Sequence, residues 1–218
     1  MIHKDCIIVA VTGGMGCGQT TVCKFMEEMG AKAIQADLVA KKEIEMNDEI
    51  RQELEKTFGN RIFYRDGKLN RKLLANIAFA DEAKTERLNR IVHPQMVSSI
   101  VSLVEEIRES QKYSIILVDA VLIYELSLEH MFDAVVVVAS KMNHRLERIR
   151  KRDNLSDKEI IDRINKQIPI DDKMQWADYL IENNDDLETL KKNSRKLFYK
   201  LQKQVRRKSQ TARHRVQH

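Results

Sequence analysis

A glycine-rich segment near the start of the chain has the spacing of a phosphate-binding loop. The pattern Gly13-x-x-x-x-Gly18-Gln19-Thr20 follows an apolar run and precedes a segment with helical periodicity, the context in which such loops occur. Glycines let successive backbone N–H groups point inward, and the positive end of the helix dipole attracts polyphosphate. A glycine-rich turn without a ligand is the alternative, which four glycines in six positions disfavour. The predicted nucleotide-binding residues are Gly14, Met15, Gly16, Cys17, Gly18, Gln19, Thr20 and Thr21.

Gln19 occupies the position at which this motif has lysine. That lysine places a positive charge against the β- and γ-phosphates during phosphoryl transfer. Glutamine donates hydrogen bonds but cannot neutralise charge, and losing one such preorganised contact commonly costs on the order of 10²–10³ in rate. We therefore expect nucleotide binding with slowed catalysis, and we expect another cation, such as Arg148 or Arg152, to offset part of the loss.

Two carboxylates follow predicted strands. Asp37 comes just after the second strand, where a carboxylate can accept the proton of an attacking hydroxyl; from position alone, a solvated acid or a helix cap is equally good. Asp119 directly follows the apolar run Ile115–Val118, where it can bind Mg²⁺ together with Thr20 or through water. Because a charge is costly to bury without a partner, magnesium is the simplest explanation of Asp119.

Three arginines follow the fourth predicted strand. Arg145, Arg148 and Arg152 are spaced by three and four residues, which puts them on one face of a helix. Such a face is usually a solvated surface, and the spacing alone favours that interpretation over a binding role. In a kinase with a phosphate-binding loop, it becomes a lid whose guanidinium groups bind phosphate oxygens. We select Arg148 and Arg152 for this catalytic role.

Alternating strands and helices must position these side chains. Between the second and third strands only helical periodicity appears, which predicts a helical insertion at 38–112. A basic helix pair predicts a lid at 144–170, and its second helix begins with the capping box Ser156-x-x-Glu159. The order predicts an α/β fold with an open, doubly wound, parallel five-stranded sheet, whose ligands bind beyond the carboxyl ends of the strands. The predicted strands are Cys6–Thr12, Ala31–Gln35, Tyr113–Val118, Ala134–Ala139 and Tyr179–Ile181.

Composition excludes several classes of protein. With 218 residues, 43% hydrophobic and 33% charged, the chain suits one compact domain rather than a disordered or collagen-like protein. Its apolar runs are far shorter than the ~20 residues of a membrane span, and no secretory signal opens it. Three cysteines without metal-ligand spacing suggest neither a disulfide framework nor a zinc site. We expect a soluble, cytoplasmic protein.

The formal net charge of +5 is concentrated at the end of the chain. Residues 202–218 contain six basic and no acidic side chains, so the remainder is nearly neutral. Such a segment can attract RNA, but it has no aromatic side chain on which a base could stack. We therefore expect a single domain at 1–201, a disordered basic tail at 202–218, no membrane or specific nucleic-acid partner, and a monomer.

Several short motifs, in their order along about Ile7–Asn184, resemble the dephospho-CoA kinase family. Beyond Gln19, the chain departs from the family pattern at Gln35, which replaces the first acid of Asp-Ala-Asp, and at Val121, which replaces proline. The matching segments are Val11–Thr21, Gln35–Asp37, Asp66–Arg71, His93-Pro94, Asp119–Glu125, Arg148, Arg152-Asp153, Arg163, Gln167 and Ala177–Asn183.

The resemblance implies a P-loop kinase that moves the γ-phosphate of ATP to the ribose 3′-hydroxyl of dephospho-CoA, the last step of coenzyme A biosynthesis. It implies Mg²⁺ on Thr20 and Asp119, Asp37 as the catalytic base, and Asn183 near the adenine of ATP. The implied acceptor-binding residues are Asp37, Arg71, His93 and Asp119. Without the resemblance, His93 is more simply a packed histidine. Two alternatives stay open: a kinase for another small hydroxyl acceptor, and a catalytically impaired nucleotide- or CoA-binding regulator, which Gln19 and Gln35 suggest.

Overall fold

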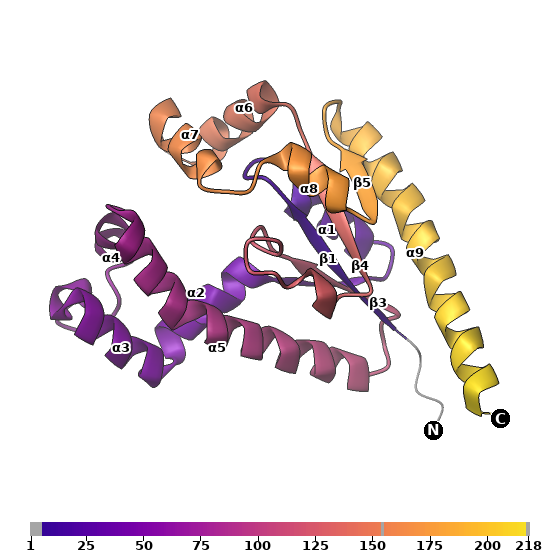
Figure 1. The fold of residues 1–218 in the computed structure, drawn as a ribbon, viewed down its shortest axis with the longest axis horizontal. Helices are drawn as coiled ribbons and strands as arrows, with labels where there is room; N and C mark the ends of the chain where they lie inside the picture. Colours follow the sequence, from indigo (N-terminus) through magenta and orange to yellow (C-terminus); the bar gives the residue numbers. More distant parts are fainter. Residues whose placement is uncertain (1–5, 154, 217–218) are drawn as a thin grey trace. The chain divides into compact units, whose positions relative to one another are not determined.

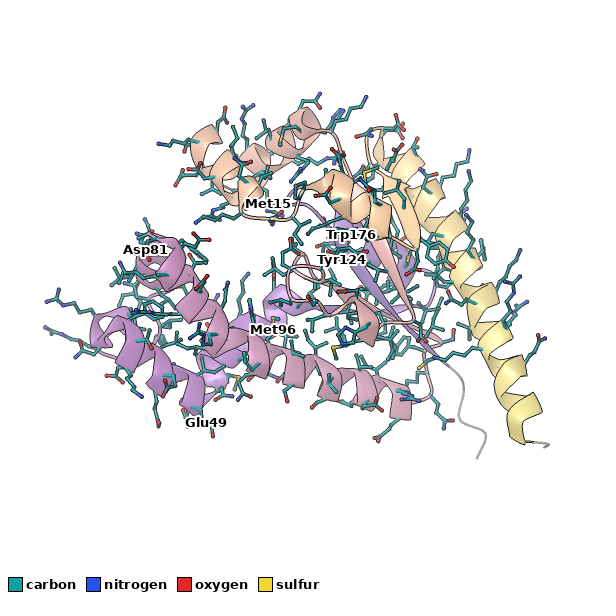
Figure 2. The ribbon with its side chains drawn as sticks, in the orientation of Figure 1. Met15, Glu49, Asp81, Met96, Tyr124 and Trp176 are labelled. Carbon is teal, nitrogen blue, oxygen red and sulfur yellow. The ribbon has the colours of Figure 1, made fainter. Side chains whose placement is uncertain are left out.

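The computed structural model describes residues 6–153 and 155–216, with side chains to residue 210 (Figures 1 and 2). The chain forms two compact units. The first combines Met1–Gln35 with Val104–His218, and the second is Ala36–Leu103. Among the described residues, no helix has both the length and the apolar character needed to cross a lipid bilayer.

A parallel sheet forms the centre of the first unit. Its strands lie in the order β2-β3-β1-β4-β5, and every neighbouring pair is parallel. The central strands are continuous apolar runs because both of their faces are covered. The predicted five-stranded parallel sheet is thus confirmed. The strands are β1 (Ile7–Gly13), β2 (Lys32–Gln35), β3 (Ile115–Asp119), β4 (Ala134–Ala139) and β5 (Tyr179–Glu182).

The strand register brings the predicted functional segments to one edge of this sheet. Val11 of β1 pairs with Asp119 of β3, and Gly13 pairs with Val138 of β4. All the strands run in one direction, so the loops after β1, β3 and β4 leave the sheet at the same edge. This is the carboxyl edge, where ligands of open α/β sheets bind.

Helices cover both faces of the sheet. On one face, α1 (Gln19–Glu27) and α9 (Leu187–Val216) contribute to the same apolar core, and Figure 1 shows α9 running along that side of the unit. On the other face, α8 (Ile170–Trp176) packs with the segment after β3. There Trp176 meets Tyr124 edge to face, with ring centroids 5.3 Å apart (Figure 2).

A helix pair follows β4. It consists of α6 (Met142–Arg152) and α7 (Asp157–Asn165), whose apolar contact is formed by Ile149, Ile160 and Ile164. The predicted capping box is present: Ser156 N–H donates to Glu159, and Glu159 N–H donates to the Ser156 hydroxyl.

The second unit is helical, apart from a short irregular segment that contains the 3-10 turn Asn60–Ile62. Its core is a small apolar cluster around Leu54 and Ile62. Pro94 lies inside one continuous helix, although proline lacks the N–H group that a helix interior normally uses. The helices are α2 (Ala36–Met46), α3 (Asp48–Phe58), α4 (Arg71–Ala78) and α5 (Glu82–Glu109), the last of which continues into the first unit.

The prediction of a disordered tail from Gln202 is wrong for the described part of that segment. Helix α9 extends to Val216, and both Leu201 and Val205 are buried in the core of the first unit. Leu197, Leu201 and Val205 recur every four residues, which places them on one helix face. Counting charges alone missed this apolar stripe; residues 217 and 218 lie outside the described residues.

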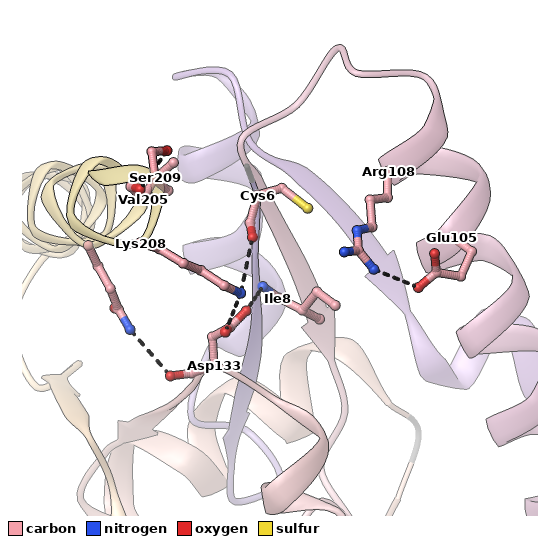
Figure 3. A network of polar contacts seen from close by, with 9 residues as sticks. Cys6, Ile8, Glu105, Arg108, Asp133, Val205, Lys208 and Ser209 are labelled. Carbon is pink, nitrogen blue, oxygen red and sulfur yellow. Dashed lines mark hydrogen bonds and ion pairs between the residues drawn. The ribbon is translucent and has the colours of Figure 1, made fainter. Parts of the chain in front are cut away.

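A polar network also attaches this helix to the sheet (Figure 3). Lys208 Nζ lies 2.6 Å from Asp133 Oδ1, and the other carboxylate oxygen of Asp133 accepts a hydrogen bond from Ile8 N–H at 2.9 Å. Lys208 Nζ also donates to the Cys6 carbonyl at 3.5 Å. One cation of the predicted tail therefore holds the beginning of β1.

Candidate active site

The glycine loop lies between β1 and α1, as the sequence predicts. A Cβ on Gly13 would come within 2.2 Å of the Val138 carbonyl oxygen, and one on Gly18, whose φ is +102°, would come within 2.4 Å of the Asn183 amide nitrogen. Both positions therefore require glycine. Cys17 N–H donates to the Gly14 carbonyl at 3.1 Å, which curls the loop at the amino end of α1.

Thr20 and Asp119 meet at the carboxyl edge of the sheet. The Thr20 hydroxyl donates to Asp119 Oδ2 at 2.6 Å. Thr20 lies in the first turn of α1, and Asp119 is the last residue of β3. The described side chains contain no cluster of three or more His, Cys, Asp or Glu that could hold a metal ion alone. Two oxygen donors beside a phosphate loop fit Mg²⁺, which usually takes its other ligands from water and substrate phosphate.

Gln19 fills the position of the missing lysine without providing a charge. Its side chain is only 6% exposed. The amide Nε2 donates to the Gly14 carbonyl at 3.0 Å, so the side chain stays inside the loop that it belongs to. The glutamine satisfies a loop carbonyl, as an ammonium group could, but it adds no net positive charge there.

Arg145 reaches the same loop from α6. It is 4% exposed, and its Nε donates to the Met15 carbonyl at 2.9 Å. A Cβ on Gly14 would lie 2.6 Å from its Nη2, so the guanidinium group lies directly against the loop backbone. The helical spacing placed Arg145 on one face with Arg148 and Arg152, but spacing alone gave no reason to select it.

Arg148 and Asn183 join the loop to the ends of β4 and β5. Arg148 Nη2 donates to the Asn183 carbonyl at 3.0 Å, and its Nη1 donates to the Ser140 hydroxyl at 3.1 Å and to the Gly16 carbonyl at 3.4 Å. Asn183 Nδ2 in turn donates to the Cys17 carbonyl at 2.8 Å. The structure therefore brings both predicted residues to the loop.

Arg152 differs from these two arginines. Its side chain is 64% exposed, and it forms an ion pair with Asp153 at 2.7 Å. The hydrogen bond from Arg152 holds the pKa of the Asp153 carboxyl below its usual value. In this structure, Arg152 is a surface residue at the end of α6 and not one of the loop contacts described above.

A buried lysine that the sequence analysis missed lies behind the loop. Lys173 of α8 is 0% exposed, and its Nζ contacts Glu125 Oε1 at 2.7 Å, the Val121 carbonyl at 2.9 Å and the Gly13 carbonyl at 3.3 Å. One lysine in a short polar segment gives no signal that it is buried. Since Glu125 neutralises it, Lys173 fixes the start of the loop without adding net charge.

The remaining predicted residues belong to the second unit. Asp37 is exposed in the first turn of α2, and Arg71 at the start of α4 forms an ion pair with Glu45. His93 lies within α5, where burial lowers the pKa of its imidazole. Their roles toward an acceptor stay predictions.

The charges around the loop affect the pKa of the Cys17 thiol. Burial raises the pKa of the Cys17 thiol, whereas the positive charges of Arg145 and Arg148 act in the opposite direction. The two arginines of α6 therefore create a positive potential at the loop. A polyphosphate bound by the loop amides would be stabilised by the same potential.

Comparison with known proteins identifies the family. A family model described as dephospho-CoA kinase matches residues 7–189. The chain belongs to the dephospho-CoA kinase family. It is 34% identical, over 182 residues, to the dephospho-CoA kinase of Bacillus licheniformis, which covers 83% of this chain and 90% of that protein.

Solved structures of similar fold agree with this family. The dephospho-CoA kinase from Campylobacter jejuni has a TM-score of 0.61 and 26% identity, and covers 89% of this chain and 96% of that one. The TT1252 structure from Thermus thermophilus has a TM-score of 0.75 at 24% identity, covers 91% of this chain and 99% of that one, and supports the fold alone. As a member of the dephospho-CoA kinase family, the chain is a kinase with a P-loop fold.

Proposed function

We propose that this chain transfers the γ-phosphate of ATP to the ribose 3′-hydroxyl of dephospho-CoA, which yields coenzyme A and ADP. The observation that carries this proposal is the 2.6 Å hydrogen bond between Thr20 and Asp119 beside the glycine loop, in a chain of the dephospho-CoA kinase family. A nucleotide-binding loop and oxygen ligands for a divalent cation are the parts that phosphoryl transfer requires.

The loop residues hold the nucleotide in this proposal. Loop N–H groups at the amino end of α1 bind phosphate oxygens, apart from those already bonded within the protein, such as Cys17 N–H to the Gly14 carbonyl. Asn183 binds on the nucleotide side, near the adenine. Thr20 and Asp119 would hold Mg²⁺, which supplies charge neutralisation at the phosphates when it is bound. Arg148, fixed by its contacts with Ser140 and Asn183, is preorganised to support the loop.

The transfer itself exchanges one bond for another. The acceptor's 3′-oxygen forms a bond to the γ-phosphorus while the bond from that phosphorus to the β–γ bridging oxygen breaks, and ADP leaves with the electron pair. Asp37 accepts the proton of the hydroxyl. Arg71 and His93 bind the acceptor, whose pyrophosphate is anionic. To do so, Arg71 must break its ion pair with Glu45 and bind a phosphate group in its place.

A coupled assay of ADP release across several acceptors tests this function. We expect turnover with dephospho-CoA and Mg²⁺ that far exceeds turnover with adenosine, with small alcohols or without an acceptor. Equal or greater turnover with another hydroxyl compound would contradict the proposed acceptor. The rate with dephospho-CoA then shows how much of the missing lysine's contribution to catalysis the natural protein retains.

Gln19 and Gln35 favour one second candidate, a regulator that binds ATP or a CoA-related ligand without turning it over. These residues remove a cation and an acid from the family pattern. Thermal stabilisation by dephospho-CoA together with no detectable turnover of any acceptor would support this candidate over the kinase.

A further inference from the structure

Two side chains from distant parts of the sequence meet at Gly14. Gln19 Nε2 donates to its carbonyl at 3.0 Å, and Nη2 of Arg145 lies 2.6 Å from where a Cβ on this glycine would be. Gln19 belongs to α1 and Arg145 to α6. The neutral amide and the guanidinium group therefore share the part of the loop where the motif's lysine would carry its charge.

The charge of Arg145 is not neutralised by its surroundings. Among the side chains that the structure describes, no carboxylate forms an ion pair with it, and Nε is the one guanidinium donor with a hydrogen-bond partner. Lys173, in contrast, is paired with Glu125. Arg148 uses its donors on Gly16, Ser140 and Asn183.

A buried cation without a counter-charge has a physical cost. Arginine does not release its proton in proteins, so Arg145 must carry its charge in a nearly buried position, and such burial is unfavourable unless an opposite charge compensates it. The polyphosphate of a nucleotide would supply that charge. The two Nη groups would remain available for phosphate oxygens while Nε holds the Met15 carbonyl.

We propose that Arg145 supplies the positive charge that the glycine loop lacks at Gln19, by direct contact with the phosphates of the bound nucleotide. This inference rests on the proposed function, in which the loop binds ATP. Arg145 forms no covalent bond and transfers no proton; it compensates the charge that develops as ADP leaves. It replaces Arg148 and Arg152 as the residue that offsets the missing lysine.

The proposal also explains why a neutral side chain suits position 19. A lysine there would bring an ammonium group to Gly14, where the guanidinium group of Arg145 already lies. Two positive charges beside the same loop residue repel each other, and they do so more strongly when solvent is excluded. Restoring the lysine should therefore help only after Arg145 has lost its charge.

A double-mutant cycle tests this dependence between the two positions. It compares the natural protein with Gln19→Lys, Arg145→Gln and the double variant, by kcat with dephospho-CoA and by the Kd for ATP. We expect Arg145→Gln to lower kcat by about 10²–10³-fold and Gln19→Lys alone to give no gain. The double variant should recover at least about tenfold over Arg145→Gln, as expected for coupled residues.

Three results would overturn the proposal. They are a gain of about tenfold or more from Gln19→Lys alone, an unchanged kcat and Kd in a folded Arg145→Gln variant, and a double variant no better than Arg145→Gln. Arg150→Gln is the matched control, since Arg150 lies on the same helix but forms an exposed pair with Asp157; it should leave kcat and Kd unchanged.

The Kd for ATP keeps this test separate from the acceptor. If the natural protein phosphorylates no acceptor, the proposed function fails, yet the cycle of ATP affinities still decides the role of Arg145. If Arg145→Gln does not fold, the Gln19→Lys variant alone tests the proposal. An unchanged ATP affinity in that variant supports the proposal, and a tenfold gain in ATP affinity overturns it. AMP, which lacks the β- and γ-phosphates, should bind all four proteins with similar affinity.

Discussion

The charged side chains around the glycine loop of the first unit are wholly or partly buried, whereas the charged side chains predicted to bind the acceptor in the second unit are exposed. In the first unit, Lys173 and Arg145 are almost fully buried and contact loop carbonyls. In the second unit, Arg71 is half exposed and pairs with Glu45, and Asp37 is exposed. Buried groups with fixed partners are preorganised, whereas exposed pairs exchange partners easily. Under the proposed function, the nucleotide-binding residues of the first unit are therefore preorganised, whereas the acceptor-binding candidates of the second unit exchange their partners when the acceptor binds.

Removing Lys173 should have the largest effect on stability. Lys173→Met leaves the carboxylate of Glu125 nearly buried and unpaired, and breaking such a pair typically costs about 3–5 kcal/mol in the free energy of unfolding. Urea denaturation measures this cost. The double variant Lys173→Met with Glu125→Leu should regain a large part of it, because no buried charge is then left alone. A single variant as stable as the natural protein would show that this lysine is not needed to hold the loop.

Shortening α9 should have an intermediate effect. A chain that ends at Gln204 loses Val205 from the core and Lys208 from its pair with Asp133. Burial of one valine contributes about 1.5–3 kcal/mol, and the partly exposed ion pair adds at most about 1 kcal/mol. The melting temperature should fall by roughly 3–16 °C.

A chain that ends at Gln210 is the control for this truncation. It keeps Val205, Lys208 and the bond from Ser209 to the Val205 carbonyl, so its melting temperature should stay close to that of the full chain. Equal melting temperatures of both truncated chains would mean that the end of α9 does not hold the first unit together.

Arg71 should affect binding more than stability. Since its pair with Glu45 is about half exposed, Arg71→Gln should change the free energy of unfolding by less than about 1 kcal/mol. The KM for dephospho-CoA should nevertheless rise by about tenfold, because charge-assisted bonds to phosphate are typically worth 1.5–3 kcal/mol. Lys72→Gln, one residue away, serves as the comparison. A large loss of stability with an unchanged KM would reverse the contrast between the two units.

His93 should produce the smallest effect, and it depends on pH. Burial lowers the pKa of this imidazole below its ordinary value of 6.5, so the unfolded chain takes up a proton at a higher pH than the folded chain. Stability should therefore decrease as the pH falls through 6.5, and level off below the lowered pKa of the folded state. His93→Gln should flatten the melting temperature between pH 7 and pH 5.5. An equally steep curve in this variant would assign the pH dependence to other groups.

The parts that were predictable from the sequence share one physical cause. A strand buried on both faces needs a continuous apolar run, so the three central strands β1, β3 and β4 were visible in the sequence, and parallel strands bring their carboxyl ends together. Those two facts predict that Thr20 and Asp119 approach each other. The glycine loop was visible because close backbone contacts, such as Gly13 against Val138, allow no side chain.

The parts that were missed depend on contacts between distant segments. Arg145, Arg148 and Arg152 have the same type and share one helix face, so only packing against the loop distinguishes the first two from the exposed Arg152. Lys173 lies 160 residues after Gly13, and nothing near it in the sequence shows where its ammonium group goes. The basic residues after Gln202 hid the apolar stripe that attaches α9 to the core.

Identification of the phosphorylated product tests the central claim most directly. The natural protein is incubated with Mg²⁺, dephospho-CoA and ATP labelled in the γ-phosphate, and the products are separated beside authentic coenzyme A. We expect the label on the ribose 3′-oxygen, and we expect Asp37→Asn to bind ATP with unchanged affinity but to form no labelled product. Label at another position, or undetectable transfer by a natural protein that still binds ATP, would contradict it.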